Sequence, residues 1–163
     1  MQIERSDSLV RESGEERRSM YYRVHLRDLP NGSVEATCPD IPAFFTVQPS
    51  KSEALRFVRE NLAVTLQGAY RKRHLPVPVS RPRKDEAAVP LPVRVQAKII
   101  LWNYMLRNRW RIADLAKELA ITQSQAQRLV DFDRDLASME SIEEAFMAIG
   151  GSFSLEEKNP GTR

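Results

Sequence analysis

The sequence predicts an α+β protein in which a small β-sheet domain is followed by a mostly helical domain. Residues 22–47 alternate apolar and polar side chains in short runs, which is typical of strands with one buried face. From residue 97 onward the apolar residues recur at helical spacing, and residues 112–129 read as two short helices joined by a tight turn. A chain of 163 residues is long enough for one ordinary domain or two small ones.

Three strands are expected in the first half of the chain. The first alternates Tyr22, Val24 and Leu26 with basic residues, and Asn31-Gly32 is a frequent hairpin turn sequence. A second strand covers residues 33–38, and a third covers the short apolar run 44–47. The sequence Pro-Asp-Ile-Pro at 39–42 separates these two strands.

A helix is expected after the third strand, because Ser50 and Glu53 have the spacing of a capping box. Its apolar stripe comprises Leu55, Val58, Leu62, Leu66 and Ala69. Residues 71–84 then hold six Lys or Arg, three prolines and no acid, which excludes a helix and predicts an extended linker or edge segment. A short edge strand is expected within 87–93.

The helical second half begins with a hydrophobic helix over residues 97–106. Another capping box, Ser141 with Glu144, predicts a helix that stops at Gly150-Gly151. Residues 152–156 alternate like a strand, and a lone strand needs a partner. The simplest partner is the same strand of a second subunit, which predicts a two-fold homodimer.

The segment 112–129 has the pattern of a helix-turn-helix. Its first helix repeats Ile112, Leu115, Ala116 and Leu119 on one face. In its second helix, Thr122 and Gln125 form a capping box, while Ala126 and Leu129 point inward. Ala120 occupies the turn position that glycine usually holds, so we expect a somewhat irregular turn.

The polar face of the second helix predicts DNA binding. A helix-turn-helix presents the first residues of this helix to the major groove, where Gln pairs with adenine and Arg with guanine. Residues 94–128 contain seven basic residues, Lys98 among them, and two acidic ones. Residues 131–163 contain eight acidic residues and three basic ones. A purely structural helical hairpin is the alternative. The candidate base-reading residues are Gln123, Ser124, Gln127 and Arg128, the candidate phosphate contacts are Arg109, Arg111 and Lys117, and Thr122 adds a secondary backbone contact to its capping role.

Composition restricts the class of protein further. The single cysteine, Cys38, excludes a disulfide framework and a multi-cysteine metal site, and suits a reducing cytoplasm. No apolar run approaches the ~18 residues of a membrane span. We therefore expect a cytoplasmic protein with no membrane partner and no cofactor.

The order of these motifs resembles the HicB family of antitoxins over about residues 20–157. The resemblance rests on Pro39–Pro42, on the Ser-x-x-Glu-Ala-Leu sequence at 50–55, on 75–78 and 89–91, on Lys98, and on the helix-turn-helix. The chain departs from the family pattern at Ala43, where glycine is common, and at the bulky pair Phe44-Phe45 that follows. The second strand is also more polar than is usual in the family.

This resemblance implies a partial RNase H-like fold of β-β-β-α(-β) order in the first domain. That domain would bind and block a small HicA-type toxin, which is an mRNA ribonuclease, although the resemblance does not name the contact residues. The second domain would form a homodimer or a higher oligomer and bind the operator DNA of its own operon. The alternative is a stand-alone transcriptional regulator whose first domain senses a small ligand.

The expected domain organisation follows from these patterns. Residues 1–19 are polar and charged, so we expect a disordered extension there, and Met20, just before the first strand, is an alternative start. Residues 20–70 form the toxin-binding core, and 71–93 form a basic, proline-rich linker with an edge strand. Residues 94–157 form the DNA-binding and dimerisation domain, and 158–163 a flexible tail.

Catalysis is not expected, although RNase H-like enzymes use carboxylates to hold two metal ions. The acidic residues of the first domain do not form a cluster in the sequence. His25 falls on the polar face of a strand and His74 in the basic segment. The chain has no phosphate-binding or nucleophile motif, and an active nuclease remains a third hypothesis. The acidic candidates are Asp28, Glu35, Asp40, Glu53 and Glu60.

Overall fold

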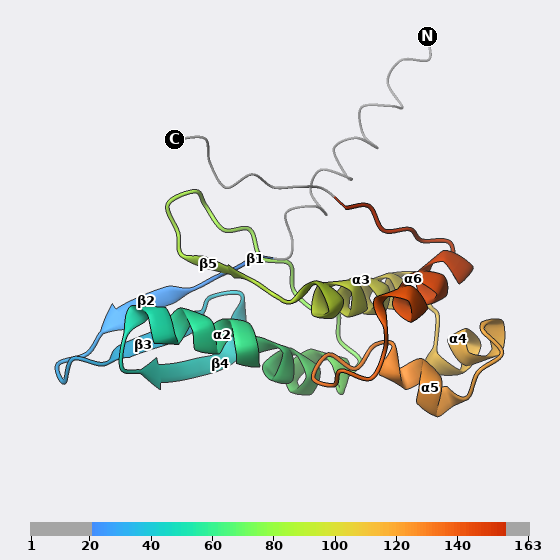
Figure 1. The fold of residues 1–163 in the computed structure, drawn as a ribbon, viewed down its shortest axis with the longest axis horizontal. Helices are drawn as coiled ribbons and strands as arrows, with labels where there is room; N and C mark the ends of the chain where they lie inside the picture. The colour runs from blue at the N-terminus through green and yellow to red at the C-terminus, as the bar shows by residue number, and fades with distance from the viewer. Residues whose placement is uncertain (1–20, 156–163) are drawn as a thin grey trace, which may run out of the picture. The chain divides into compact units, whose positions relative to one another are not determined.

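The computed structural model describes residues 21–155, and the chain divides into two compact units between Gln96 and Ala97. The first unit contains β1 (Tyr21–Arg23), β2 (His25–Asp28), β3 (Val34–Cys38), β4 (Ile41–Gln48), α2 (Lys51–Leu66), η1 (Gln67–Arg71) and β5 (Ala88–Pro90). The helices α3 (Val93–Arg107), α4 (Ile112–Glu118), α5 (Gln123–Arg128) and α6 (Met139–Ala148) follow (Figure 1). The α+β class expected from the sequence is therefore confirmed.

The central sheet has the antiparallel order β2-β3-β4. Val34, Ala36 and Cys38 of β3 are buried, as their alternation predicted. The hairpin between β2 and β3 is also confirmed, and Gly32 follows its turn with a φ of 85°. The third strand is longer than predicted, because Pro42 is tolerated at the start of an edge strand.

The first predicted strand changes partner at Val24. Its first part, β1, pairs with β5, and its second part, β2, pairs with β3. At the junction the Val24 N–H donates to the Ala87 carbonyl at 2.7 Å. Tyr22 and Val24 are both buried, as their alternation with polar residues predicted, although the strand changes partner between them and β2.

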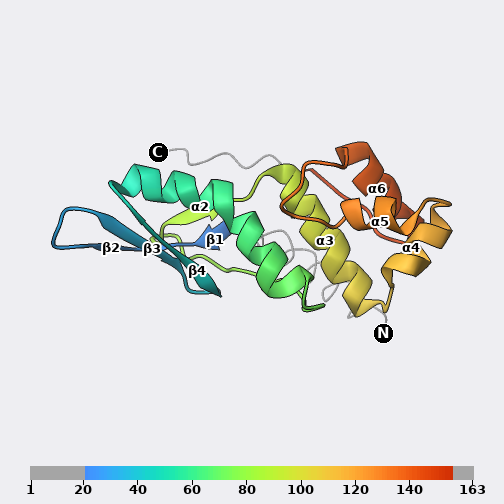
Figure 2. The same ribbon diagram turned by 90° about the horizontal axis from the view of Figure 1, so that it is seen from below.

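Helix α2 packs on one face of the β2-β3-β4 sheet (Figures 1 and 2). The backbone N–H of Glu53 donates to the Oγ of Ser50 at 3.3 Å, which confirms the predicted N-cap. The predicted apolar stripe is wrong at both ends, where Leu55 and Ala69 are only partly buried. At the first end the smaller Ala54 takes the buried position. The buried residues of α2 are Ala54, Val58, Leu62, Ala63 and Leu66.

A π-helical turn, η1, explains the second departure. Lys72 N–H donates to the Gln67 carbonyl five residues earlier, at 2.9 Å. A π-turn inserts one extra residue and rotates the following residues around the helix axis. Gln67 and Arg71 therefore occupy the buried face that helical periodicity assigned to Ala69. The helical turn includes Arg71, although the basic segment was predicted to be non-helical from that residue.

The proline-rich segment 71–93 belongs to the first unit, and the edge strand predicted within 87–93 is β5, which pairs with β1. Val77 and Ser80 are buried. The Tyr22 hydroxyl donates to the Pro78 carbonyl at 2.9 Å, and the Arg23 N–H donates to Ser80 Oγ at 3.1 Å. The prolines keep the segment extended, and its backbone and hydroxyl groups give β1 hydrogen-bond partners.

Asp40, in the turn between β3 and β4, connects three parts of the first unit. Its carboxylate accepts hydrogen bonds from Arg23 Nε at 2.9 Å, Arg23 Nη2 at 3.1 Å and Ser80 Oγ at 2.6 Å. Partial burial raises the pKa of Asp40, but the hydrogen bonds from Arg23 and Ser80 outweigh it and hold the pKa below its ordinary value. The ionised carboxylate therefore stabilises the fold.

Cys38 lies at the end of β3, and its side chain is only 2% exposed. Burial and, to a smaller extent, the nearby Asp40 charge raise the pKa of its thiol to about 12. The thiol is therefore protonated at neutral pH.

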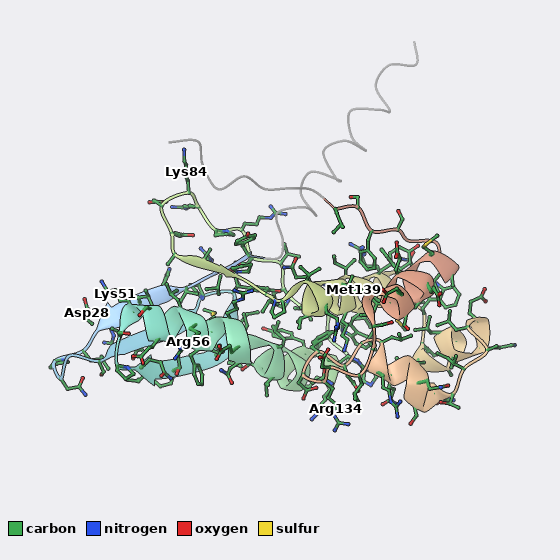
Figure 3. The ribbon with its side chains drawn as sticks, viewed as in Figure 1. Asp28, Lys51, Arg56, Lys84, Arg134 and Met139 are labelled. Carbon is green, nitrogen blue, oxygen red and sulfur yellow. The ribbon has the colours of Figure 1, made fainter. Side chains whose placement is uncertain are left out.

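Lys98 is the main polar contact inside the second unit. Its side chain is 1% exposed, and its Nζ donates to the carbonyls of Asp131 at 2.8 Å and Arg134 at 2.6 Å. The Arg134 side chain itself points outward (Figure 3). The sequence analysis included Lys98 in the positive surface charge of the DNA-binding segment, and this is wrong. Its ammonium group is buried and donates to main-chain carbonyls.

Helices α3, α4 and α6 end in the same way. Each passes through one residue with positive φ, namely Arg109 at 58°, Ala120 at 53° and Gly150 at 99°. After α4, Ala120 N–H donates to the Lys117 carbonyl and Ile121 N–H to the Ala116 carbonyl. This pair of bonds is a Schellman motif. The turn at Ala120 is thus regular, and the predicted irregularity is wrong, although alanine bears the cost of positive φ.

Helix α6 begins one turn earlier than predicted. Ser138, not Ser141, is its N-cap, and the Ser141 N–H donates to Ser138 Oγ at 3.1 Å. The predicted end is confirmed, and a Cβ at Gly151 would overlap the Phe146 ring.

Residues 152–155 are not part of a strand in the single chain, and their predicted pairing with a second subunit stays a prediction. Phe153 instead packs on Phe146, with ring centroids 4.6 Å apart. The predicted extension 1–19 and tail 158–163 lie outside the described residues. Over 21–155, no helix is long and apolar enough to cross a membrane.

We expect Asp40→Asn to lower the free energy of unfolding by about 1–3 kcal/mol at neutral pH, because hydrogen bonds to a charged acceptor are lost. A carboxyl with a depressed folded-state pKa stabilises the fold above its unfolded pKa near 3.8, and the contribution is lost as pH falls through the folded pKa. The difference between wild type and variant should therefore shrink below about pH 4. Urea unfolding of both proteins at several pH values measures this difference in the free energy of unfolding. Asp28→Asn is the control, since Asp28 is exposed, and an equal effect there would contradict the assignment.

Ala120→Gly should raise the free energy of unfolding by about 0.5–1 kcal/mol, because glycine adopts the positive φ of this turn without a steric penalty. Ala113→Gly, at an exposed position inside α4, should lower it by a similar amount. Thermal unfolding of the full chain measures both. The same sign for the two variants would show that backbone strain at Ala120 does not limit stability.

Candidate nucleic-acid interface

Helices α4 and α5 pack against each other through small and apolar side chains. Leu115 and Ala116 of α4 and Ala126 of α5 are buried. Alanine at 116 and 126 allows the two backbones to approach closely, and Leu129 continues this core beyond the end of α5. The helical hairpin predicted for 112–129 is therefore present.

The start of α5 is fixed by a reciprocal capping box. Gln125 N–H donates to Thr122 Oγ1 at 3.1 Å, and Thr122 N–H donates to Gln125 Oε1 at 3.0 Å. These bonds satisfy two backbone donors that the first helical turn leaves without partners. They also occupy the Gln125 side chain, which is consistent with its assignment to capping rather than to base reading.

The four candidate base-reading side chains are all exposed on α5. Gln123 and Ser124 lie in its first turn, and Gln127 and Arg128 in its last. Thr122 is exposed beside them at the N-cap. Because α5 is held by its buried alanine and its cap, these side chains project from a fixed backbone.

The three candidate phosphate contacts are exposed as well, but they differ in their surroundings. Arg109 has positive φ at the end of α3, and Lys117 lies in the last turn of α4. Arg111 donates to Asp114 through Nε at 3.0 Å and Nη2 at 3.1 Å. These hydrogen bonds lower the pKa of Asp114 and raise that of Arg111. The Arg111 charge is therefore partly neutralised by its neighbour.

The candidate carboxylates of the first unit lie apart and serve other contacts. Glu35 pairs with Arg27 at 2.7 Å, and Asp28 lies 3.8 Å from Lys51 (Figure 3). Glu53 lies at the start of α2, and Glu60 is exposed on that helix. Within residues 21–155, no group of three or more His, Cys, Asp or Glu side chains is arranged to hold a metal ion. His25 and His74 are both exposed.

Sequence reasoning missed an apolar surface on the sheet face opposite α2. Phe45 is 62% exposed and Val47 is 42% exposed, both on β4. They pair with Thr37 and Glu35 of β3 in register, on the side away from the buried Ala36. The sequence held a signal for this surface, because consecutive residues of a strand point to opposite faces. One residue of the pair Phe44-Phe45 therefore had to point away from the core.

Curated proteins similar to this chain are antitoxins. The chain is 30% identical to antitoxin HicB 2 of Photorhabdus laumondii over 118 residues, which cover 72% of this chain and 82% of that protein. It is 29% identical to antitoxin HicB of Pseudomonas fluorescens over 130 residues, covering 79% and 88%. Antitoxin HicB 1 of Photorhabdus laumondii is 24% identical over 141 residues, covering 85% and 87%.

No protein-family model matches the chain. The similarity to the curated antitoxins nevertheless spans both compact units, since 141 aligned residues exceed the length of either one. The motif order, the α+β architecture and this similarity agree, and the chain belongs to the HicB family of antitoxins.

Proposed function

We propose that the first unit binds and neutralises a HicA-type toxin and that the second unit represses the operon by binding operator DNA. The observation that carries the proposal is that each compact unit exposes side chains suited to binding a partner. The first unit has the apolar pair Phe45 and Val47, and the second has the polar face of α5. A non-enzymatic role is part of the proposal, and the relatives' description as antitoxins supports it.

The outer face of the β2-β3-β4 sheet is the toxin surface in this proposal. Exposed aromatic residues are enriched at the centres of protein interfaces, where they contribute most of the binding energy. Phe45 would be such an anchor, with Val47 beside it and the Arg27–Glu35 ion pair at its polar rim. The antiparallel order of this sheet and its covering helix α2 also support the proposal of a partial RNase H-like fold.

The α4–α5 hairpin is the DNA surface, as a helix-turn-helix. Its second helix presents Gln123, Ser124 and Gln127 for base contacts, and a defined backbone at the capped end makes these contacts specific. Arg109, Arg111 and Lys117 are the proposed phosphate contacts, and Arg111 is the one whose charge Asp114 partly neutralises. Arg128, at the last residue of α5, stays a predicted base contact.

Phe45→Ser should weaken toxin binding at least about tenfold, because it removes a central aromatic anchor. The control is Val64→Ser, at a side chain that is 56% exposed on α2. A HicA-type toxin would be titrated against the purified full chain, and cell rescue on co-expression gives a second readout. Equal affinity of the Phe45 and Val64 variants would place the toxin elsewhere on the molecule.

Gln127→Ala should reduce affinity for the operator by about 1–3 kcal/mol and relax specificity at one base pair. Lys117→Ala should weaken binding to all duplexes evenly and lower the salt slope by about one unit. Fluorescence anisotropy would be measured with the DNA upstream of the gene and with a scrambled duplex, over a range of salt concentrations. If the wild-type chain does not distinguish the two duplexes, operator recognition by α5 is excluded.

A further inference from the structure

The basic residues of the segment 71–84 form two exposed pairs on the first unit. Lys72 and Arg73 lie in the turn directly after η1, and Arg83 and Lys84 lie in the loop before β5. Lys84 stands at the tip of that loop (Figure 3). Residues 61–84 contain no acidic residue, although protein surfaces usually intersperse both signs of charge. The two pairs differ in the charges beside them.

The turn after η1 has a fixed backbone. His74 N–H donates to the Arg71 carbonyl at 3.2 Å, and Leu75 N–H donates to the Tyr70 carbonyl at 2.9 Å. These two bonds form a Schellman motif, and His74 has the positive φ of that motif, at 55°. The two cations that precede His74 therefore project from a defined position on the surface of the first unit.

Lys72 and Arg73 form no ion pair with another residue of the range 21–155. The second pair has acidic neighbours, because Asp85 follows Lys84 directly and the Glu86 carboxylate accepts a hydrogen bond from the Arg83 N–H at 2.9 Å. The loop before β5 is therefore balanced in charge, while Lys72 and Arg73 keep theirs.

Cations at the end of a helix also have a structural explanation. The last turn carries the negative end of the helix dipole, which is equivalent to about half an elementary charge and favours a cation there. Lys72 and Arg73 together carry about four times that charge. A net positive charge therefore remains after the dipole is satisfied, and it attracts an anionic partner.

The composition of the segment favours duplex phosphates over unpaired bases. Single strands bind largely by stacking their bases on exposed aromatic rings. The one Phe, Tyr or Trp among residues 70–84 is Tyr70, and it is partly buried. Duplex phosphates, in contrast, are bound by Lys and Arg without any base contact.

We propose that Lys72 and Arg73 are a second, sequence-independent contact of this chain with double-stranded DNA. The inference rests on the proposed operator binding, which brings a duplex to the chain, and it adds phosphate contacts from the first unit to base reading by α5. Such contacts raise the affinity for every duplex and leave the preferred sequence unchanged.

The test uses the full chain with Lys72→Gln and Arg73→Gln combined, and fluorescence anisotropy with a scrambled duplex over a range of salt concentrations. Two phosphate contacts contribute about 1.8 to the slope of log affinity against log salt, so the double variant should lose about that much slope. A fourfold rise in salt should then cost the wild type roughly tenfold more affinity than it costs the variant. The ratio of affinities for operator and scrambled duplex should not change.

The matched control combines Arg83→Gln with Lys84→Gln, which removes the same charge from the balanced loop and should leave the slope nearly unchanged. Urea unfolding checks that both double variants are folded. An equal loss of slope in the two variants would reveal a general effect of net charge and overturn the proposal, as would an unchanged slope in the Lys72 and Arg73 variant. A loss seen with a single strand of the same sequence but not with the duplex would overturn the choice of partner.

This contact and base reading by α5 can fail separately. If α5 does not read the operator, the wild type binds operator and scrambled duplex equally, while the difference in salt slope between the wild type and the Lys72 and Arg73 variant persists. If the turn after η1 does not contact DNA, that difference disappears while the preference for the operator remains.

Discussion

The second unit depends on one buried ammonium group. Moving an ammonium group out of water is costly unless hydrogen bonds replace its hydration. Lys98 meets this requirement with two main-chain carbonyls that lie 33 and 36 residues further along the chain. These carbonyls belong to the loop between α5 and α6. One side chain of α3 thereby holds two points of the loop between α5 and α6.

In the first unit, a carboxylate connects distant parts of the chain in a similar way. Asp40 holds Arg23 and Ser80, which are separated from it by 17 and 40 residues. Each anchor is satisfied by residues of its own unit. The toxin surface that we propose on β4 and the DNA surface that we propose on α5 therefore rest on separate polar networks, and a substitution in one network should leave the other recognition surface intact.

Local signals in the sequence predicted most elements but not the contacts between distant residues. The sequence predicted the N-caps at Ser50 and Thr122 and the hairpin at Gly32, because capping and turn geometry depend on a few adjacent residues. The π-turn at η1 was not readable, since its extra residue depends on what the helix packs against. Charge counting placed Lys98 on the surface, because composition does not show which cations find buried acceptors. The exposed Phe45 was readable in principle from two adjacent aromatic residues on a strand.

The distribution of two residue types gives each unit its own spectroscopic reporter. The chain has one cysteine, Cys38, in the first unit, and two tryptophans, Trp102 and Trp110, in the second. The Cys38 thiol is buried and has a raised pKa, so a thiol reagent reacts with it only when the sheet opens. Trp102 is 2% exposed, and its fluorescence reports the loss of packing around α3. The unmodified chain thus permits the opening rate of each half to be followed separately in a single sample.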